Sequence, residues 1–410
     1  MTIDRRSDPN RDSTFRFEYQ PPTINCGRGC VAALASELER QGLERALVVC
    51  GSTVGETPAV MEPVRMGLGD RLAGVFDETT PRKRLSTAID ARDRLDDADA
   101  NAIVSVGGGS SLDTATVASV LAASDRPAAD VADELAETGS ITVPDEGLAP
   151  ILAVPTTLAG AELSMIAGIT AAPESGLVDE EIGGSLGGPE LMPDATFYDP
   201  DIVATTPESV LAGSAMNGFD KGVETIYANN ATPITDATAS RGLSLLVDGL
   251  SAFGRGDRNT ATFETILEGN MLVQYGISRP DELTLSIIHA FGHGLTRTYS
   301  VQQGSAHGIV APHVLEYLFD TSGVDARQEV LAAALGVDGA ATTSEAVVDA
   351  VADVRDALSL PSRLRDVDGP EPDEFPAVAE AILSDSFMDN APPGLDPSAE
   401  EIEAILERAW

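Results

Sequence analysis

Ala102-Ile-Val-Ser-Val106 runs directly into Gly107-Gly-Gly-Ser-Ser-Leu-Asp113, and a helical pattern begins at Thr114. A short apolar run before a glycine turn predicts a buried strand that ends at the N-terminus of a helix. Glycines let the backbone approach a ligand, and the N–H groups and dipole of the helix favour a phosphate. A glycine turn can also be merely tight, and the spacing is neither GxGxxG nor a P-loop. We predict a nucleotide cofactor site formed by Gly107, Gly108, Gly109, Ser110 and Asp113.

The segment from Phe15 to Asp201 alternates between short apolar runs and longer amphipathic stretches. Besides the strand at 102–106, the pattern predicts strands at Ala46–Cys50 and Ile151–Val154 and helices at Val31–Gln41 and Arg84–Leu95. This alternation is typical of a parallel sheet covered by helices on both faces.

Two threonines, Thr156 and Thr157, follow the strand predicted at 151–154. Ligands of open parallel sheets bind beyond the carboxyl ends of the strands, so both hydroxyls are predicted to contact the cofactor. The segment Asp125–Glu146 is polar and contains proline, and it is predicted to be an insertion before this strand.

The character of the chain changes after Pro200. Thr206-Pro-Glu208 predicts a helix start with a hydroxyl cap, and Ser398-Ala-Glu-Glu401 predicts a capping box for the last helix, up to Trp410. An acidic linker is predicted at Asp366–Glu374. The sequence therefore predicts a flexible leader at 1–14, an α/β domain at 15–204 and an all-helical domain at 205–410.

The composition is strongly acidic. The chain of 410 residues carries 66 acidic against 26 basic side chains, a net charge of −40, and only Lys83 and Lys221 are lysines. An acidic surface of this kind repels itself at low salt, so we expect a cytoplasmic protein of a salt-accumulating halophile. Nucleic acid and anionic membranes are not expected partners.

The sequence has no strong signal for secretion, membrane insertion or disulfides. The N-terminus lacks the apolar core of a signal peptide, and no apolar run approaches the ~20 residues of a membrane span. Three cysteines, Cys26, Cys30 and Cys50, are too few for a closed zinc site and are expected to be reduced structural thiols.

All four histidines lie in one window, at His289, His293, His307 and His313. Histidine is the side chain best suited to proton transfer and metal ligation near neutral pH, so the window predicts the site of the chemistry. His289 and His293 are four residues apart and would share one face of a helix. Two core histidines on a helix are the alternative interpretation. His313 follows Pro312, where a new helix is predicted to begin, and is expected to be structural.

Taken together, these motifs resemble the iron-containing alcohol dehydrogenase superfamily. The resemblance covers about Phe17 to Trp410 and rests on the glycine turn, Pro155-Thr-Thr157, Met216–Glu224 with Ala231-Thr-Pro-Ile234, and the histidine window. It implies the dehydroquinate synthase-like fold: an N-terminal α/β dinucleotide-binding domain and an all-α C-terminal domain, with the active site between them. It also implies a homodimer. The ungapped Pro155–Glu162 loop is similar to that of the maleylacetate reductase branch.

The chain departs from the metal-ligand pattern of this superfamily. Where the resemblance implies one Asp and three His, the sequence has Asn217, Lys221, His289 and Gln303. Neutral amides are weak ligands and an ammonium repels a cation, so no divalent metal is expected at this position. A rearranged metal site formed by Asp220, His289, His293 and His307 is the alternative.

The cofactor is expected to be NAD or NADP. Many NAD-using relatives place an Asp at the end of the second strand, where this chain has Gly51, which leaves room for a 2′-phosphate but supplies no cation. The lysine that usually follows the glycine turn is replaced by Thr116.

For the chemistry we expect Lys221 to replace the metal as the electrophile or proton donor, and His289 or His293 to relay the proton. The resemblance favours His293 near the nicotinamide. Asn217, Gln303 and His307 are predicted to bind the substrate. Lys221 could instead be a surface lysine paired with Glu224 or Asp220.

The predicted function is hydride transfer between NAD(P) and a small carbonyl compound, which is an aldehyde, a ketone or an oxo acid, and its alcohol. A metal-dependent alcohol dehydrogenase is the first alternative. The others are a lyase or synthase of the dehydroquinate synthase type, and a non-catalytic nucleotide-binding protein.

Overall fold

The computed structural model describes residues 14–124, 126–280, 282–339 and 342–410. The predicted leader at 1–14 therefore lies almost entirely outside the described residues. The strands are β1 (Thr23–Cys26), β2 (Ala46–Gly51), β3 (Leu72–Thr79), β4 (Ala102–Gly107), β5 (Ile151–Pro155), β6 (Ile166–Ala171), β7 (Ile182–Gly187), β8 (Ala195–Tyr198), β9 (Ser278–Arg279) and β10 (Glu282–Leu283).

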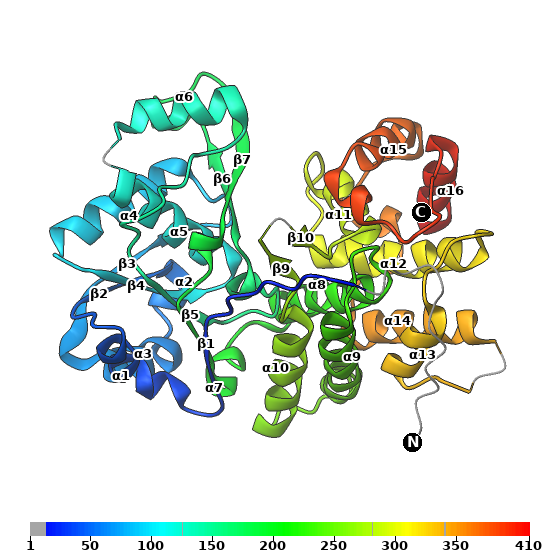
Figure 1. Ribbon diagram of the computed structural model, residues 1–410, viewed down its shortest axis with the longest axis horizontal. Helices are drawn as coiled ribbons and strands as arrows, with labels where there is room; N and C mark the ends of the chain where they lie inside the picture. The colour runs from blue at the N-terminus through cyan, green and yellow to red at the C-terminus, as the bar shows by residue number, and fades with distance from the viewer. Residues whose placement is uncertain (1–13, 125, 281, 340–341) are drawn as a thin grey trace.

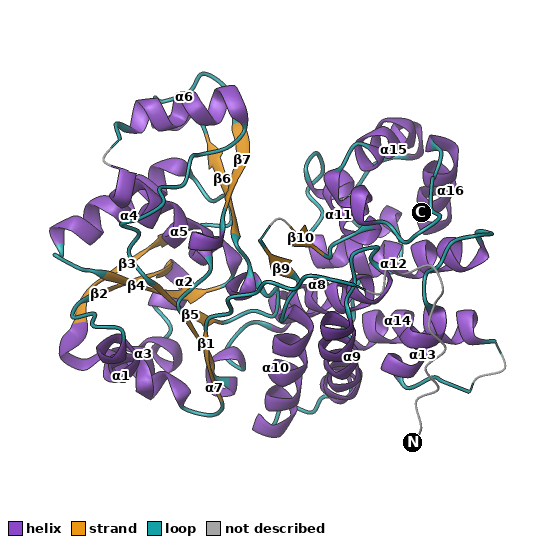
Figure 2. Cartoon of the chain, viewed as in Figure 1, coloured by secondary structure: helices purple, strands orange, loops and turns teal. Residues whose placement is uncertain are grey.

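Helices alternate with the strands in the first half and dominate the second half (Figure 2). The first half contains α1 (Leu34–Arg40), α2 (Ser52–Gly55), α3 (Pro58–Leu68), α4 (Leu85–Asp97), α5 (Gly109–Ser124), α6 (Ala128–Thr138) and α7 (Pro200–Val203). The second half contains α8 (Glu208–Tyr227), α9 (Pro233–Gly254), α10 (Thr260–Gln274), α11 (Ile287–Thr296), α12 (Gln303–Asp320), α13 (Gln328–Leu335), α14 (Thr343–Ala357), α15 (Phe375–Leu383) and α16 (Ala399–Ala409).

The central sheet has six parallel strands in the order β1-β8-β5-β4-β2-β3. Successive side chains of β2 point to opposite faces: Val48 packs with helices α1 and α3, whereas Leu47 packs with α4 and α5. Both faces are therefore apolar, as a doubly covered parallel sheet requires. The predicted fold class, an α/β domain followed by a helical domain, is confirmed (Figure 1).

The glycine turn lies at the point where the strand order reverses. From β2 the chain passes to β3 at one edge and returns to β4 on the other side of β2. A crevice forms at such a point beyond the carboxyl ends of the strands, where open α/β sheets bind ligands. Gly51 ends β2 and Gly107 ends β4, so the topology brings these two predicted cofactor residues to the same crevice.

The predicted insertion at 125–146 precedes β5 and contains helix α6, whose buried Leu135 packs against the β6–β7 hairpin. Three local predictions need correction. The Thr206 hydroxyl does not cap α8, whose N-cap is Pro207. It donates instead to the Thr156 carbonyl, just after strand β5. Helix α12 does not begin at Pro312 but runs through it, since the apolar residues on both sides are buried. The second half is not entirely helical, since β9 and β10 form a short hairpin.

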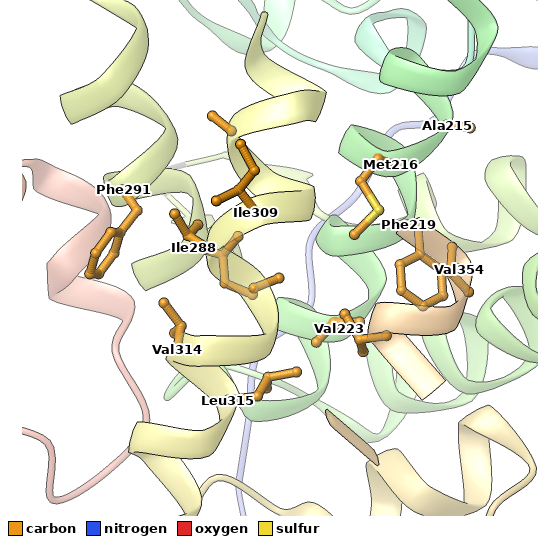
Figure 3. Close-up of a cluster of buried hydrophobic side chains, with 14 of the residues drawn as sticks. Ala215, Met216, Phe219, Val223, Ile288, Phe291, Ile309, Val314, Leu315 and Val354 are labelled. Carbon is orange, nitrogen blue, oxygen red and sulfur yellow. The ribbon is translucent and has the colours of Figure 1, made fainter. Parts of the chain in front are cut away.

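The helical half has its own core. Figure 3 shows Met216, Phe219 and Val223 of α8 in one cluster of buried side chains with Ile309 of α12 and Val354 of α14. The predicted capping box at Ser398 is present at the start of α16. All three cysteines are free. Within the described ranges, no helix is long and apolar enough to cross a membrane.

Candidate active site

A cavity of about 270 Å³ lies between the sheet edge and the helical half. Most of the predicted catalytic and substrate-binding residues line it, and so do two of the predicted cofactor residues. These lining residues are Asn217, Lys221, His289, His293, Gln303, Gly109 and Asp113. The structure therefore brings together side chains from three helices of the second half and from the glycine turn.

Helix α8 divides its faces between the core and the cavity. Met216, Phe219 and Val223 are fully buried in the helical core (Figure 3). Asn217 and Lys221, one turn apart, face the cavity instead. The apolar periodicity of the helix thus fixes the direction of its two polar residues.

Lys221 is half-buried and held by the loop that follows β5. Its Nζ donates a hydrogen bond to the Ala159 carbonyl at 2.7 Å. Burial lowers the pKa of Lys221 from 10.5 to about 8, against the opposing effect of Glu162 and Glu224. Such an ammonium is still charged at neutral pH and can give up its proton more readily than an exposed lysine.

The loop that holds Lys221 depends on Gly160. This residue has φ +75°, and a Cβ atom there would lie 2.1 Å from the Gln274 side chain. Only glycine combines that backbone conformation with so close a contact. The position of the Ala159 carbonyl, and with it the direction of the Lys221 side chain, is therefore set by one glycine.

His289 is buried between a carboxyl group and an amide. Its Nδ1 lies 2.5 Å from Glu224 Oε2, and its Nε2 lies 3.2 Å from Asn217 Oδ1. The backbone N–H of His289 donates to the second oxygen of Glu224. Burial lowers the pKa of His289 well below its usual value, and nearby His307 and Lys221 lower it further. Burial also raises the pKa of Glu224 to about 7. His289 is therefore a neutral imidazole with a fixed orientation.

His293 is only partly buried, and its partner comes from a distant part of the chain. Its Nδ1 lies 2.8 Å from Asp385 Oδ2, in the segment between α15 and the short helix Ser386–Asn390. Arg297 pairs with the same carboxylate at 3.0 Å. Burial would raise the pKa of Asp385, but hydrogen bonds from His293 and the Phe387 N–H lower it below its usual value. Arg297 Nη2 also lies 2.9 Å from His293 Nδ1, so both partners are on the Nδ1 side of the ring and Nε2 is left for the cavity.

Gln303 reaches the cavity because helices α8 and α12 cross in close contact. A Cβ atom on Gly304 would lie 1.7 Å from the Gly213 carbonyl, so the crossing requires glycine at this position. Gln303 is the first residue of α12 and lines the cavity beside Asn217. Their amides can donate to or accept from a substrate oxygen.

The cofactor side of the cavity is built by the glycine turn. Gly107 has φ +150°, and a Cβ atom on Gly108 would lie 2.9 Å from the Thr157 side chain. The Thr156 N–H donates to the Gly107 carbonyl, so the two predicted strand ends are joined directly. The N-terminus of the 16-residue helix α5 begins here, at Gly109, and Ser110 is the next residue. These features fit the phosphate groups of a dinucleotide.

One residue, His307, is placed differently from the prediction. His307, predicted to bind the substrate, does not line the cavity: its fully buried ring packs edge-to-face against His289 with the centroids 4.3 Å apart. Its Nδ1 lies 3.4 Å from Asp220 Oδ2, and both side chains are completely buried. A Cβ atom on Gly292 would lie 2.3 Å from His307 Nε2, so the small residue at 292 lets the ring pack behind His289.

The residues at the usual metal position do not fit a divalent cation. The Lys221 ammonium donates an N–H to the Ala159 carbonyl, and Asn217 and Gln303 offer neutral amides, so His289 is the single strong metal ligand of the four. In the rearranged set, His293 pairs with Asp385, whereas His307 and Asp220 are completely buried behind His289 and do not line the cavity. Among the described residues, no three His, Cys, Asp or Glu side chains are arranged to hold a metal ion.

Asp385, Phe387 and Lys83 also belong to the site, although the sequence patterns do not predict them there. Asp385 and Phe387 carry no local motif, and they reach His293 only because the chain returns to the cavity after α15. Lys83 was noted for its rarity, which is the signal that could have placed it in the site. Its Nζ forms an ion pair with Asp113, at the cofactor side of the same cavity.

Two family models match almost the whole chain. The model for iron-containing alcohol dehydrogenase matches residues 21–200, and the model for the C-terminal part of the same family matches residues 211–410. Among known proteins, a maleylacetate reductase of Pseudomonas aeruginosa is 28% identical over 97% of each chain. A lactaldehyde reductase of Escherichia coli K12 is 26% identical over 94% of this chain and 97% of its own.

Solved structures show the same fold. The sulfoacetaldehyde reductase of Bifidobacterium kashiwanohense, in complex with NAD+, superimposes with a TM-score of 0.83 over 97% of this chain and 99% of its own, at 18% identity. The predicted resemblance, including its maleylacetate reductase-like character, is confirmed. The chain belongs to the iron-containing alcohol dehydrogenase family, whose members are oxidoreductases of alcohols and carbonyl compounds.

Proposed function

We propose that this protein is an NAD(P)-dependent oxidoreductase that interconverts a small carbonyl compound and its alcohol, with Lys221 in the role that relatives give to a metal ion. The observation that carries the proposal is the half-buried Lys221 ammonium. It is anchored to the Ala159 carbonyl, with a pKa lowered to about 8, in the cavity that also contains His289 and His293. Both NAD and NADP stay open, as does the choice among aldehyde, ketone and oxo acid.

When bound, the nicotinamide cofactor supplies or accepts the hydride. In reduction, the carbonyl oxygen gains negative charge as its carbon accepts the hydride. The Lys221 ammonium donates a hydrogen bond to this oxygen and then transfers its proton, so that the product is a neutral alcohol. The desolvated position of Lys221 strengthens its interaction with the developing charge.

The remaining side chains position the substrate and return the proton. Asn217, in the middle of α8, and Gln303, at the start of α12, orient the substrate oxygens. His293, held by Asp385, is a quarter exposed and can exchange protons with solvent, so it is the better candidate for reprotonating Lys221. His289 is buried and neutral, and it holds Asn217 in place.

The experiment is a screen of NADH and NADPH oxidation against aldehydes, ketones and oxo acids in molar KCl, because a net charge of −40 calls for screening. The same sample is analysed for metal before and after chelator treatment. We expect turnover that survives chelation without added metal. Turnover that is lost on chelation and restored by a divalent cation would favour the metal-dependent alternative. Cofactor binding without turnover of any carbonyl would contradict the proposal.

A further inference from the structure

The two lysines of the chain line the same cavity. The other 24 basic residues, which are the 26 Lys and Arg less these two, are arginines, and none of them lines it among the described residues. Lys221 comes from helix α8 of the helical half, whereas Lys83 comes from the turn between β3 and α4 of the sheet half. Two ammonium groups thus line one cavity, one from the sheet half and one from the helical half.

The Lys83 backbone is held in an uncommon conformation. Its φ is +49°, in the left-handed region that a residue with a side chain rarely adopts. The turn is tied down by the Thr170 N–H, which donates to the Lys83 carbonyl at 2.9 Å, and by the Lys83 N–H, which donates to Thr80. Strain of this kind persists where the surroundings fix a functional side chain.

The side chain is anchored but keeps free donors. Lys83 Nζ pairs with Asp113, whose carboxyl also accepts the Gly168 N–H at 3.2 Å. The Lys83 side chain is 35% exposed, against 8% for Asp113. An ammonium has three N–H donors, and one of them is used by this ion pair. The others are available to a ligand in the cavity.

Two ammonium groups and one carboxyl group line the cavity, in a protein that is otherwise strongly acidic. Asp113 is the one carboxyl group among its lining residues in the described chain, and it is paired with Lys83. Lys221 adds a second ammonium, and His289 is neutral. A local positive potential inside a protein of net charge −40 attracts an anion that the rest of the surface repels.

We propose that the Lys83 ammonium binds an anionic group, a carboxylate or an equivalent oxyanion, carried by the carbonyl substrate whose reacting oxygen lies at Lys221. This inference rests on the proposed function and narrows its substrate class to carbonyl compounds with a negative charge. Lys83 is then a specificity-determining residue contributed by the cofactor-binding half.

The kinetic test compares ω-oxo carboxylates of increasing length with the n-alkanals of the same carbon number. The wild-type protein, Lys83→Met and Lys83→Arg are assayed with saturating NADH or NADPH. A lost charge-assisted hydrogen bond is worth about 10- to 100-fold. We expect the wild type to prefer the carboxylate by that factor in kcat/KM, Lys83→Met to lose the preference through KM, and Lys83→Arg to retain most of it.

A second measurement does not depend on turnover. Calorimetry measures the binding of succinate and glutarate to the complex with NADH, and fluorescence measures the Kd of NADH itself. Anion affinity that is tenfold weaker in Lys83→Met, with the Kd of NADH unchanged, supports the proposal even if the substrate screen finds no turnover. Equal anion affinity overturns it. A change confined to NADH affinity also overturns it, because Lys83 would then serve the cofactor.

A double variant separates the anion site from a structural ion pair. Lys83→Met leaves Asp113 unpaired and could unfold the turn, whereas Lys83→Met with Asp113→Asn restores neutrality. The double variant is expected to fold and still lack the preference for anions. An anion preference equal to that of the wild type in the double variant would refute the role of Lys83.

Discussion

Replacing Lys221 by methionine tests the chemistry most directly. Methionine has a similar length and leaves no cavity, but it removes the charge and the proton. A group with a pKa of about 8 is about 90% protonated at pH 7, so nearly every wild-type molecule carries the ammonium. Loss of one donor to a developing oxyanion costs about 10²–10³ in rate, and loss of a proton donor about 10²–10⁴. We expect kcat for carbonyl reduction to fall by about 10²–10⁴.

The dependence on pH gives a second readout of Lys221. The reduction needs the protonated lysine, so kcat is expected to fall about tenfold per pH unit above pH 8. Alcohol oxidation needs the neutral amine, so it is expected to rise through the same pH. Lys221→Met should abolish both of these pH dependences of kcat. Lys221→Arg should shift both of them above the accessible pH range, because arginine stays protonated.

The assay is steady-state kinetics in both directions, with the Kd of NADH from fluorescence as the control for folding and cofactor binding. The Kd is expected to stay within a factor of two or so, since Lys221 belongs to the substrate side of the cavity. A methionine variant that turns over within a few-fold of the wild type would show that the lysine is not the electrophile. A fall in kcat above pH 8 that is unchanged in the Lys221→Met variant would also show that the lysine is not the electrophile.

Two further predictions concern the residues that support the site. Asp385→Asn removes the carboxylate that orients His293 and pairs with Arg297, and we expect kcat to fall about 10- to 100-fold with little change in the Kd of NADH. An unaltered kcat would place His293 outside the proton path. Gly160→Ala puts a Cβ atom 2.1 Å from Gln274 at φ +75°, and we expect a loss of about 1–3 kcal/mol in the free energy of unfolding together with a lower kcat. Denaturant unfolding measures the loss of stability, and an unfolding midpoint of Gly160→Ala equal to that of the wild type would contradict it.

Much of the fold was predictable because it depends on local patterns. The strands at 46–51, 102–107 and 151–155 are buried apolar runs, and the turn before α5 needs its glycines. A short window of sequence therefore suffices to predict each of these elements. Local patterns failed where long-range contacts prevailed. Helix α12 passes through Pro312 because its apolar residues on either side are buried in the core (Figure 3).

The site divides in the same way. Asn217 and Lys221 share a helix face, as their spacing predicts, and His289 and His293 share another. Their partners could not be predicted, because Asp385 is 92 residues from His293 and Glu224 is 65 residues from His289. Nothing in the local sequence specifies which carboxylate reaches which imidazole.

The sequence by itself determined the two-part architecture and the glycine turn, since each depends on residue type and short spacing. Only the tertiary structure decided that His307 lies behind His289 and not in the cavity, because the close packing at Gly292 sets the direction of its ring. It also decided that Lys83 faces the same cavity as Lys221. The turn that carries Lys83 lies at the sheet edge because the chain crosses from β3 back to β4 and because the Thr170 N–H donates to the Lys83 carbonyl. No sequence pattern predicts that Lys83 and Lys221 line one cavity.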